Sequence, residues 1–484
     1  MSTTAPTQTT YETVIGLEIH VQLKTRTKMF CGCELTFGDP PNTHTCPVCL
    51  ALPGSLPVAN AEAIHLGLLI GLALGCELSD RSIFHRKNYF YPDSPKGYQI
   101  SQYDEPLCRG GELGGVRIHR VHLEEDAAKT IHAGGSGRIA GSEASVVDFN
   151  RGGTPLAEIV TEPDITSAEQ AGDFLRLLRT TLRQLGVSDV NMEEGSLRCD
   201  ANISIRPMGT TELGVKTELK NMNSFRYIER GIRAEAARQE ALLRAGEPVE
   251  QETLHFDHRT EQLTSMRSKE EAHDYRYFPE PDLTPVTITP AMLERAHGAL
   301  GELPADRERR FVDDLGLHAD AARLLAWRQE LGDYYEAALE AGPARTDAVV
   351  LANWTTNELL ARLDDDADPA ASDVTPAALA QLVALVQAKA VTQAGARTGL
   401  DRLVAEGGDP QAIVEAEGLG AVSGDDALQP IVKAALDADP KVAERLRSGD
   451  MKPMGAIIGA VMRETKGRAD GKEVTRLVRE ELGL

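Results

Sequence analysis

Alternation of apolar and polar residues predicts a β-strand near the start of the chain. From Leu17 to Leu23 an apolar side chain occupies every second position, and Glu18, His20 and Gln22 fall between them. A period of two is typical of a strand that buries one face. The polar face of such a strand is often only solvated, but a face that carries Glu and His can also hold a cation or position a phosphate.

Two later segments alternate in the same way and carry acidic residues. Between Val116 and Leu123 the apolar phase changes once, which predicts a β-bulge. This strand leads into three adjacent acids at 124–126. At least one of them must point to each face of the sheet, because successive side chains of a strand alternate. The segment 155–160 predicts another strand, which carries Glu158.

A strand predicted at 197–206 has polar residues at alternate positions, so that Arg198, Asp200 and Asn202 share one face. Asp and Asn are poor strand formers, and a merely wet sheet face explains them less well than a binding site does. The predicted strands together offer side chains that can converge on one or two hard cations: Glu18, His20, Glu125, Glu158 and Asp200. Carboxylate oxygens suit Mg²⁺, whereas His20 would act through water or favour Mn²⁺.

Helical periodicity dominates the C-terminal part of the chain. In the first part, Thr166 or Ser167, followed by Glu169 and Gln170, predicts the capped start of a helix that runs to Leu185, and a long charged helix is predicted over about 224–244. Near Pro304 the chain becomes rich in Ala, Leu and Arg at helical spacing, and it remains helical to the end except for a predicted hinge at 407–410. We therefore predict an α+β domain over residues 1–302, an all-α domain over 303–406 and a small all-α tail over 407–484.

Four cysteines follow the first strand in two close pairs, Cys31 with Cys33 and Cys46 with Cys49. Two pairs of thiols, each on a turn that contains Gly or Pro, match a zinc ribbon with four thiolate ligands, and closed sites of this kind are structural. His44 is an alternative ligand. The cysteines at 76, 108 and 199 show no paired spacing and are predicted to be buried as small hydrophobic side chains.

The segment 86–100 combines cations, tyrosines and prolines. A rigid loop with cations beside aromatic rings can bind phosphate and stack a base, but the same composition also suits a packed surface loop. Its first three residues, Arg86, Lys87 and Asn88, are candidate nucleotide-binding residues. Polar residues of the predicted strands join them as candidates: Arg198, Asn202 and Lys220.

Composition and charge restrict the class of protein. Over 484 residues, 42% hydrophobic and 26% charged content are typical of a soluble globular protein, and a net charge of −23 argues against a general nucleic-acid binder. A local basic patch is still possible, because the last 44 residues carry ten Lys or Arg against seven Asp or Glu. Seven cysteines, no apparent signal peptide and no long apolar run predict a reduced, cytoplasmic protein without membrane contact, and the polar residues 1–10 predict a disordered tail.

Six motifs, in order along the chain, resemble the B subunits of bacterial aspartyl/glutamyl-tRNA amidotransferases. They are TVIGLEIH at 13–20, RKNYFYPD at 86–93, EED at 124–126, RGGTPL at 151–156, EGSLRCDAN at 194–202 and DYRYFPEPD at 274–282. The resemblance implies a cradle-like catalytic domain with a mixed or antiparallel sheet, then a helical domain and a helical tail that contacts tRNA. It also implies metal-binding and active-site roles for Glu18, His20, Glu125, Glu158 and Asp200, whereas zinc rests on the cysteine spacing alone.

The resemblance further implies a two-step reaction with ATP and either Mg²⁺ or Mn²⁺ as cofactors. ATP phosphorylates the side-chain carboxylate of Glu-tRNA(Gln), Asp-tRNA(Asn) or both, and ammonia then displaces phosphate. Because no amidase nucleophile motif is evident in the sequence, ammonia is expected from a partner, the glutaminase A subunit, in a heterotrimer with a small C subunit. The misacylating synthetase is a further candidate partner.

Two other functions stay open at this point. A non-enzymatic zinc-ribbon adaptor for tRNA would explain the cysteines and the basic tail, but it leaves the acidic strand faces unexplained. A stand-alone ATP-dependent ligase would explain the acids, but the sequence offers no source of ammonia or amine.

Overall fold

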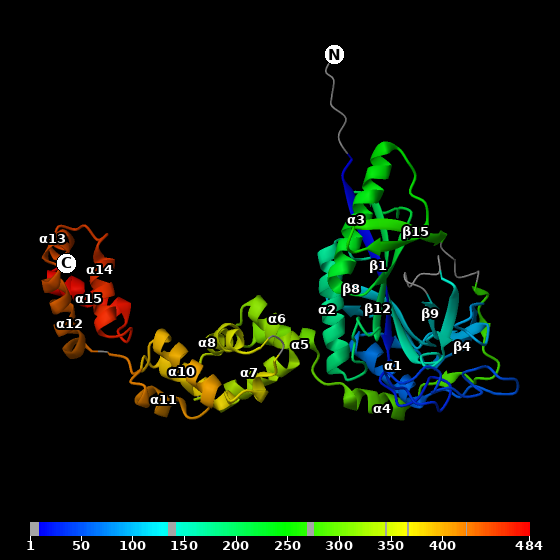
Figure 1. Ribbon diagram of the computed structural model, residues 1–484, viewed down its shortest axis with the longest axis horizontal. Helices are drawn as coiled ribbons and strands as arrows, with labels where there is room; N and C mark the ends of the chain where they lie inside the picture. The colour runs from blue at the N-terminus through cyan, green and yellow to red at the C-terminus, as the bar shows by residue number, and fades with distance from the viewer. Residues whose placement is uncertain (1–8, 134–141, 269–274, 344–345, 365–366, 423) are drawn as a thin grey trace, which may run out of the picture. The chain divides into compact units, whose positions relative to one another are not determined.

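The computed structural model describes residues 9–133, 142–268, 275–343, 346–364, 367–422 and 424–484. The chain divides into two compact units, Met1–Leu303 and Pro304–Leu484. The first unit contains strands and helices, and the second is built of helices (Figure 1). The predicted α+β class is therefore confirmed. Most of the predicted N-terminal tail lies outside the described residues, as do residues 134–137, whose glycine-rich sequence predicts a flexible hairpin tip.

A sheet of ten strands, counted within the described residues, organises the first unit around β1 (Tyr11–Gln22). Its order is β15-β14-β13-β12-β1-β11-β8-β6-β2, with β7 beside β8, and only the pair β13 and β14 is parallel. The other strands are β2 (Glu77–Leu78), β6 (Cys108–Arg109), β7 (Glu112–Leu113), β8 (Val116–Glu125), β11 (Pro155–Thr161), β12 (Leu197–Pro207), β13 (Thr217–Met222), β14 (Glu252–Asp257) and β15 (Gln262–Ser268).

The alternation of β1 fixes which face of the sheet is buried. Leu17, Ile19 and Val21 are almost fully buried, as their period of two predicts. In β8 the change of apolar phase coincides with a register shift against β11, because Val160 pairs with Arg120 while the next residue pairs with Ile118. One residue of β8 is therefore extra, and the predicted bulge is confirmed.

Helices α2 (Ala168–Gln184) and α3 (Phe225–Ala245) lie side by side along the large sheet (Figure 1). Helix α2 begins at the predicted cap, and α3 begins at its predicted start near 224. The Ser167 side chain accepts the N–H of Gln170 at 3.1 Å, and the Ser224 side chain accepts the N–H of Tyr227 at 3.2 Å. These bonds satisfy donors that a helix start would otherwise leave unpaired.

The remaining elements of the first unit surround the large sheet. Helix α1 (Ala61–Ala73) is buried on almost every side and contacts α4 (Pro290–Ala299). A small sheet, β16 (Phe278–Pro279), β4 (Phe84–Asn88) and β5 (Tyr98–Gln102), contacts β8 through β5. Two further pairs are β9 (Lys129–Ala133) with β10 (Ala144–Asp148), and β17 (Val286–Thr287) with β3 (Arg81–Ser82).

The second unit contains two hydrophobic clusters. The first joins α5 (Pro304–Asp313), α6 (Ala319–Trp327), α7 (Gln329–Ala341), α8 (Ala348–Asn353), a π-helical turn (Trp354–Leu359), α9 (Pro376–Gln387), α10 (Gln393–Glu406) and α11 (Pro410–Ala416). The second joins α12 (Asp425–Ala438), α13 (Pro440–Arg447), α14 (Met454–Glu464) and α15 (Gly471–Leu482).

Helix α11 belongs to the first of these clusters, through Val414. The two clusters therefore separate after α11 and not at the predicted hinge near 407, and the division into three domains stays a prediction. In the part of the chain that the structure describes, no helix is both long enough and apolar enough to cross a membrane.

Candidate functional site

The polar faces of the central strands line a cavity of about 730 Å³. Residues of β8, β11, β1, β12 and β13 form one side of it. Lys87 of β4 lines it as well, together with Tyr275 and Tyr277 from the segment before β16. Charged and aromatic groups from distant parts of the sequence therefore face one space.

Antiparallel pairing brings the predicted acids of β1, β11 and β12 together. Glu18 lies opposite Asp200, and His20 lies opposite Glu158, and directly opposed residues share a face. The Nε2 atom of His20 lies 3.5 Å from Oε2 of Glu158 and 4.0 Å from Oε1 of Glu18. One donor atom of each of these three residues lies within 4.8 Å of the others, so a single metal ion can contact all three.

A second group of donors adjoins the first through Glu158. Nε2 of His122 lies 3.1 Å from Oε2 of Glu158, and Oε1 of Glu124 lies 3.4 Å from Nε2 of His20. His122, Glu124 and Glu158 also offer donor atoms within 4.8 Å of one another. Glu158 therefore belongs to two candidate cation sites, one that includes Glu18 and one that includes Glu124.

Lysine and arginine side chains lie among these acids. The Nζ atom of Lys220 is 2.5 Å from Oδ2 of Asp200, and Arg198 donates to Asp126 at 2.7 Å. The carboxylates nevertheless outnumber these cations: Glu18, Glu124, Asp126, Glu158, Asp200 and Glu218 against Lys87, Arg120, Arg198 and Lys220. The cavity therefore has a deficit of positive charge that a divalent ion can fill.

The pKa values of three side chains in the cavity are raised. Repulsion from Glu158, helped by burial, raises the pKa of Glu18. Burial alone would lower the pKa of His20, but hydrogen bonds to Glu124 and Glu158 outweigh it and hold that pKa well above its ordinary value. Burial also opposes the charge of Lys87, yet attraction to Glu124 raises the pKa of this ammonium group. Each of these three shifts has the direction expected beside neighbouring carboxylates.

Most of the candidate residues from the sequence line this cavity: Glu18, His20, Lys87, Glu158, Arg198, Asp200 and Lys220. Asn202 lies on the same face of β12, opposite Gly16 and Glu218, but it is not among the described residues that line the cavity. Glu125, Arg86 and Asn88 do not line it either.

Glu125 lies on the other face of β8. After the bulge, Val121 and Leu123 point into the core, so Glu125 continues on their face and Glu124 falls on the face of the cavity. We expected Glu125 among the metal-binding acids, but Glu124 and not Glu125 lines the cavity together with Glu18 and His20. A metal-binding role for either acid stays a prediction. The alternation that begins at Val121 is the signal that could have identified Glu124.

The carboxylate of Glu125 has other partners. It forms an ion pair with Lys96 and accepts the N–H of Ile100 at 2.9 Å. These residues line a smaller cavity of about 180 Å³ beside Cys31 and Cys49. Glu125 therefore lies in a site separate from the one that contains Glu18 and His20.

The same alternation separates the three candidates on β4. Lys87 lines the cavity, while Arg86 makes two hydrogen bonds to the carboxylate of Glu280 at 2.6 and 2.8 Å. The amide of Asn88 donates to the backbone carbonyls at positions 275 and 276, both at 2.9 Å. Arg86 and Asn88 hold the segment 275–280 against β4, and of the three only Lys87 can reach a ligand in the cavity.

Sequence reasoning missed several residues that line the cavity: Tyr89, Tyr103, Arg120, His122, Glu124, Asp126, Glu218, Tyr275 and Tyr277. His122 and Glu124 follow from the alternation of β8, because they are the positions between Val121, Leu123 and Glu125. Tyr275 and Tyr277 lie in the motif at 274–282, but nothing in their local pattern indicates that they meet β4.

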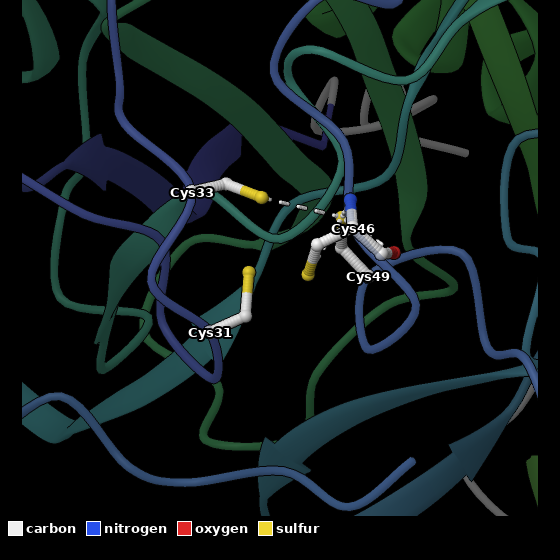
Figure 2. A group of neighbouring side chains, drawn as sticks. All are labelled: Cys31, Cys33, Cys46 and Cys49. Carbon is white, nitrogen blue, oxygen red and sulfur yellow. Dashed lines mark hydrogen bonds between the residues drawn. The ribbon is translucent and has the colours of Figure 1, made fainter. Parts of the chain in front are cut away.

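The four paired cysteines also come together, with their sulfur atoms directed toward one another (Figure 2). The Sγ atom of Cys49 lies 4.0 Å from that of Cys33 and 3.9 Å from that of Cys46. Four thiolates around one zinc ion, each about 2.3 Å from it, would lie about 3.8 Å apart. The cluster can therefore hold a metal ion. A hydrogen bond from Cys31 lowers the pKa of Cys49, and the same bond raises the pKa of Cys31.

His44, the alternative ligand, pairs instead with Asp39 at 2.8 Å. The other three cysteines, Cys76, Cys108 and Cys199, are buried as predicted. Among the described residues, the cysteine cluster and the two carboxylate–histidine groups are the sets of donors with metal-binding spacing.

Comparison with known proteins agrees with the motifs. The GatB/GatE catalytic domain matches residues 13–294, and the GatB domain matches residues 333–482. The chain is 49% identical to the aspartyl/glutamyl-tRNA(Asn/Gln) amidotransferase B subunit of Anaeromyxobacter sp. (strain K), over 98% of this chain and 99% of the relative. The proteins of the same name from Frankia casuarinae and Carboxydothermus hydrogenoformans are 48% and 44% identical, over 98% of this chain and 96% and 99% of their own lengths. The chain therefore belongs to the family of aspartyl/glutamyl-tRNA(Asn/Gln) amidotransferase B subunits.

Proposed function

We propose that this chain carries the ATP-dependent steps of tRNA amidation. An oxygen of the side-chain carboxylate of Glu-tRNA(Gln), Asp-tRNA(Asn) or both attacks the γ-phosphorus of ATP, ADP leaves, and an acyl phosphate forms. The nitrogen of ammonia then attacks the acyl carbon, inorganic phosphate leaves and a proton is lost, which gives Gln-tRNA(Gln) or Asn-tRNA(Asn). The activation is needed because an ionised carboxylate offers ammonia no competent leaving group.

The observation that carries this proposal is the group of carboxylates and fixed cations in one cavity. Carboxylate oxygens fit Mg²⁺, and the two imidazoles broaden the fit to Mn²⁺. The residues that would hold such ions are Glu18, His20, His122, Glu124, Glu158 and Asp200. When bound, the metal would neutralise charge on the phosphates.

Lysines of the cavity supply the remaining positive charge in this proposal. Lys87 and Lys220 lie beside Glu124 and Asp200 respectively, and the attraction of these acids keeps both ammonium groups charged by raising their pKa against the opposing effect of burial. Preorganised charge of this kind stabilises a phosphoryl group as its bonds change. Arg198, bound to Asp126 at 2.7 Å, can orient the acceptor carboxylate or a phosphate.

The proposal includes partners, because ammonia must be supplied to the acyl phosphate. The glutaminase A subunit would release it from glutamine, with the small C subunit in the same complex, and the misacylating synthetase would deliver the tRNA. The C-terminal segment 441–484 carries ten Lys or Arg against seven Asp or Glu, and this local excess supports a role in binding tRNA phosphates. We place the complex in the cytoplasm.

We further propose that Cys31, Cys33, Cys46 and Cys49 bind a structural zinc ion. The sulfur separations of 3.9 and 4.0 Å support this assignment. A site with four thiolates leaves no open position for a substrate, so the ion would stabilise the loop between β1 and α1 and would take no part in phosphoryl transfer.

The decisive experiment uses the complete complex with misacylated tRNA, ATP and Mg²⁺, without glutamine. Hydroxylamine should trap the acyl phosphate as a hydroxamate on the tRNA-bound amino acid, and ADP should form in step with it. If ATP is not consumed, the adaptor function replaces the enzymatic one. If the isolated chain converts misacylated tRNA with glutamine and no partner, a stand-alone ligase replaces the proposed complex.

A further inference from the structure

Tyrosine rings form a flat surface beside the carboxylates of the cavity. The rings of Tyr103 and Tyr277 are nearly parallel, with centroids 4.4 Å apart and an angle of 9° between their planes. Tyr275 meets Tyr277 edge to face at 6.2 Å, and the ammonium of Lys87 lies 5.0 Å from the centre of the Tyr275 ring. All four residues line the cavity.

The outer ring of this stack is open to a ligand. Tyr103 is 42% exposed although its ring packs on Tyr277. Packing against the core does not explain an exposed, stacked tyrosine in a cavity that many charged side chains also line. A planar ring with a free face binds another π-system, and nucleobases stack on such tyrosines irrespective of base identity.

The surroundings of the two rings hold them in place before any ligand binds. Arg86 and Asn88 fasten the segment 275–280, which carries Tyr277, to β4. The imidazole of His85 lies edge to face with Tyr103 at 6.4 Å, and its Nε2 atom pairs with Asp104 at 2.9 Å. A preorganised surface loses little entropy when a base stacks on it.

We propose that the Tyr103–Tyr277 pair receives the terminal adenine of the aminoacylated tRNA, an assignment that rests on the proposed function. Two adenines reach this cavity, one from ATP and one from the 3′ end of the tRNA. The amino acid is esterified to the terminal ribose, so the tRNA base is joined to the reacting carboxylate through one ribose, one ester bond and the amino-acid side chain, with no phosphate between them. The base of ATP lies beyond a ribose and three phosphates.

The position of the rings suits a base that no phosphate separates from the reacting carboxylate. Tyr103 and Tyr277 line the same cavity as Glu124 and Glu158, and the ammonium of Lys87, which also lines it, lies 5.0 Å from the centre of the neighbouring Tyr275 ring. A base stacked on Tyr103 would therefore occupy the cavity that holds the candidate metal-binding groups. Arg86 and Asn88 are positioning residues in this arrangement, because they act through the segment that carries Tyr277.

The test replaces the terminal adenine of misacylated tRNA with 2-aminopurine, whose fluorescence falls when it stacks on an aromatic ring. Binding to the complete complex, without ATP, should quench the signal. Tyr103→Leu keeps apolar bulk but removes the ring, so it should abolish quenching and raise the KM for tRNA about tenfold, within the range for one stacked base. Tyr103→Phe should retain both properties, and the KM for ATP should not change in either variant.

Tyr91→Ala is the matched control. Tyr91 is also an exposed member of a stacked pair, at 5.0 Å from Tyr89 and with 53% of its surface exposed, but it is not among the residues that line the cavity. It should behave like the unmodified protein. The proposal is overturned if Tyr103→Leu retains full quenching, or if it raises the KM for ATP and leaves that for tRNA unchanged, which would assign the rings to the base of ATP.

The readout separates this inference from the proposed function. Quenching is measured without ATP, so it reports the stacking alone. If quenching depends on Tyr103 but no acyl phosphate is trapped in the presence of ATP, the stacking inference is retained and the phosphorylation proposal fails.

Discussion

The cysteine cluster and the carboxylate cavity are both candidate metal sites of the first unit, but the chain assembles them in different ways. The four cysteines lie between positions 31 and 49, on the loop between β1 and α1. The donors of the cavity come from β1, β8, β11 and β12, between positions 18 and 200. The cysteine cluster therefore depends on the spacing of its residues along the chain, whereas the carboxylate cavity depends on the register between strands.

The two sites also differ in what holds their surroundings in place when the metal is absent. Lysines and arginines stand among the carboxylates, and the sheet that carries these acids is held by its own backbone hydrogen bonds and by a buried core. The cysteine loop has little regular structure of its own. Metal loss should therefore abolish chemistry at the cavity with little effect on folding, and reduce stability at the cysteine loop with little effect on chemistry.

The largest effect is expected at the cavity. Glu124→Gln or Asp200→Asn preserves volume but removes a charge that would hold Mg²⁺, so acyl phosphate formation in the complete complex should fall by about 10² or more. Folding and tRNA binding should be retained, and higher Mg²⁺ should restore part of the activity. Hydroxamate trapping and a thermal melt measure the two properties.

Glu125→Gln is the control for this prediction, because Glu125 neighbours Glu124 in sequence but lines the other cavity. Its loss of acyl phosphate formation should be much smaller. Free ammonium should not rescue Glu124→Gln, since ammonia acts after the lost step. Rescue by ammonium would mean that Glu124 serves ammonia delivery. The cavity would then not be the site where metal loss abolishes phosphorylation.

The second largest effect is expected at the cysteine cluster. Cys46→Ser should remove about one equivalent of zinc per chain. The melting temperature should fall by about 4 °C or more, which corresponds to about 2 kcal/mol in a unit of this size, while kcat of the folded fraction stays nearly unchanged. Metal analysis, calorimetry and steady-state kinetics measure these quantities. A large loss of kcat at full stability would show that the cluster takes part in the reaction.

A smaller effect should follow from deleting residues 424–484, which contain the second helical cluster and leave Val414 in the first. If this cluster binds tRNA phosphates, the KM for tRNA should rise several-fold, and the dependence of that KM on salt should become weaker because fewer counterions are released on binding. Neither candidate metal site should lose its ion. An unchanged KM for tRNA over a salt series would show that residues 424–484 do not bind tRNA.

The smallest effect is expected for a thiol outside the cluster. Cys76→Ala removes a buried cysteine that belongs to none of the candidate metal-binding groups among the described residues, so the free energy of unfolding should fall by about 1 kcal/mol. The zinc content should not change. Loss of zinc in this variant would show that the cluster is sensitive to any nearby repacking and not to its own four ligands.

Much of this protein follows from its sequence alone. The spacing of Cys31, Cys33, Cys46 and Cys49 predicts their cluster, because residues so close along a chain can meet without a particular global fold. Thr166 or Ser167, followed by Glu169 and Gln170, predicts the capped start of α2, since a cap bonds to the backbone within its own first turn. The change of apolar phase in β8 also predicts its bulge, because both depend on neighbouring residues of one strand.

Only the tertiary structure decided which polar residues meet. Arg86, Lys87 and Asn88 are adjacent in sequence, but the pleat of β4 sends Lys87 into the cavity and its two neighbours to the segment 275–280. The same alternation directs Glu124 toward His20 in the cavity and Glu125 toward Lys96 on the other face of the strand. Strand periodicity predicts that neighbouring side chains point in opposite directions. The face of the sheet that becomes the cavity, however, depends on which elements pack against each side. Those contacts join residues more than a hundred positions apart.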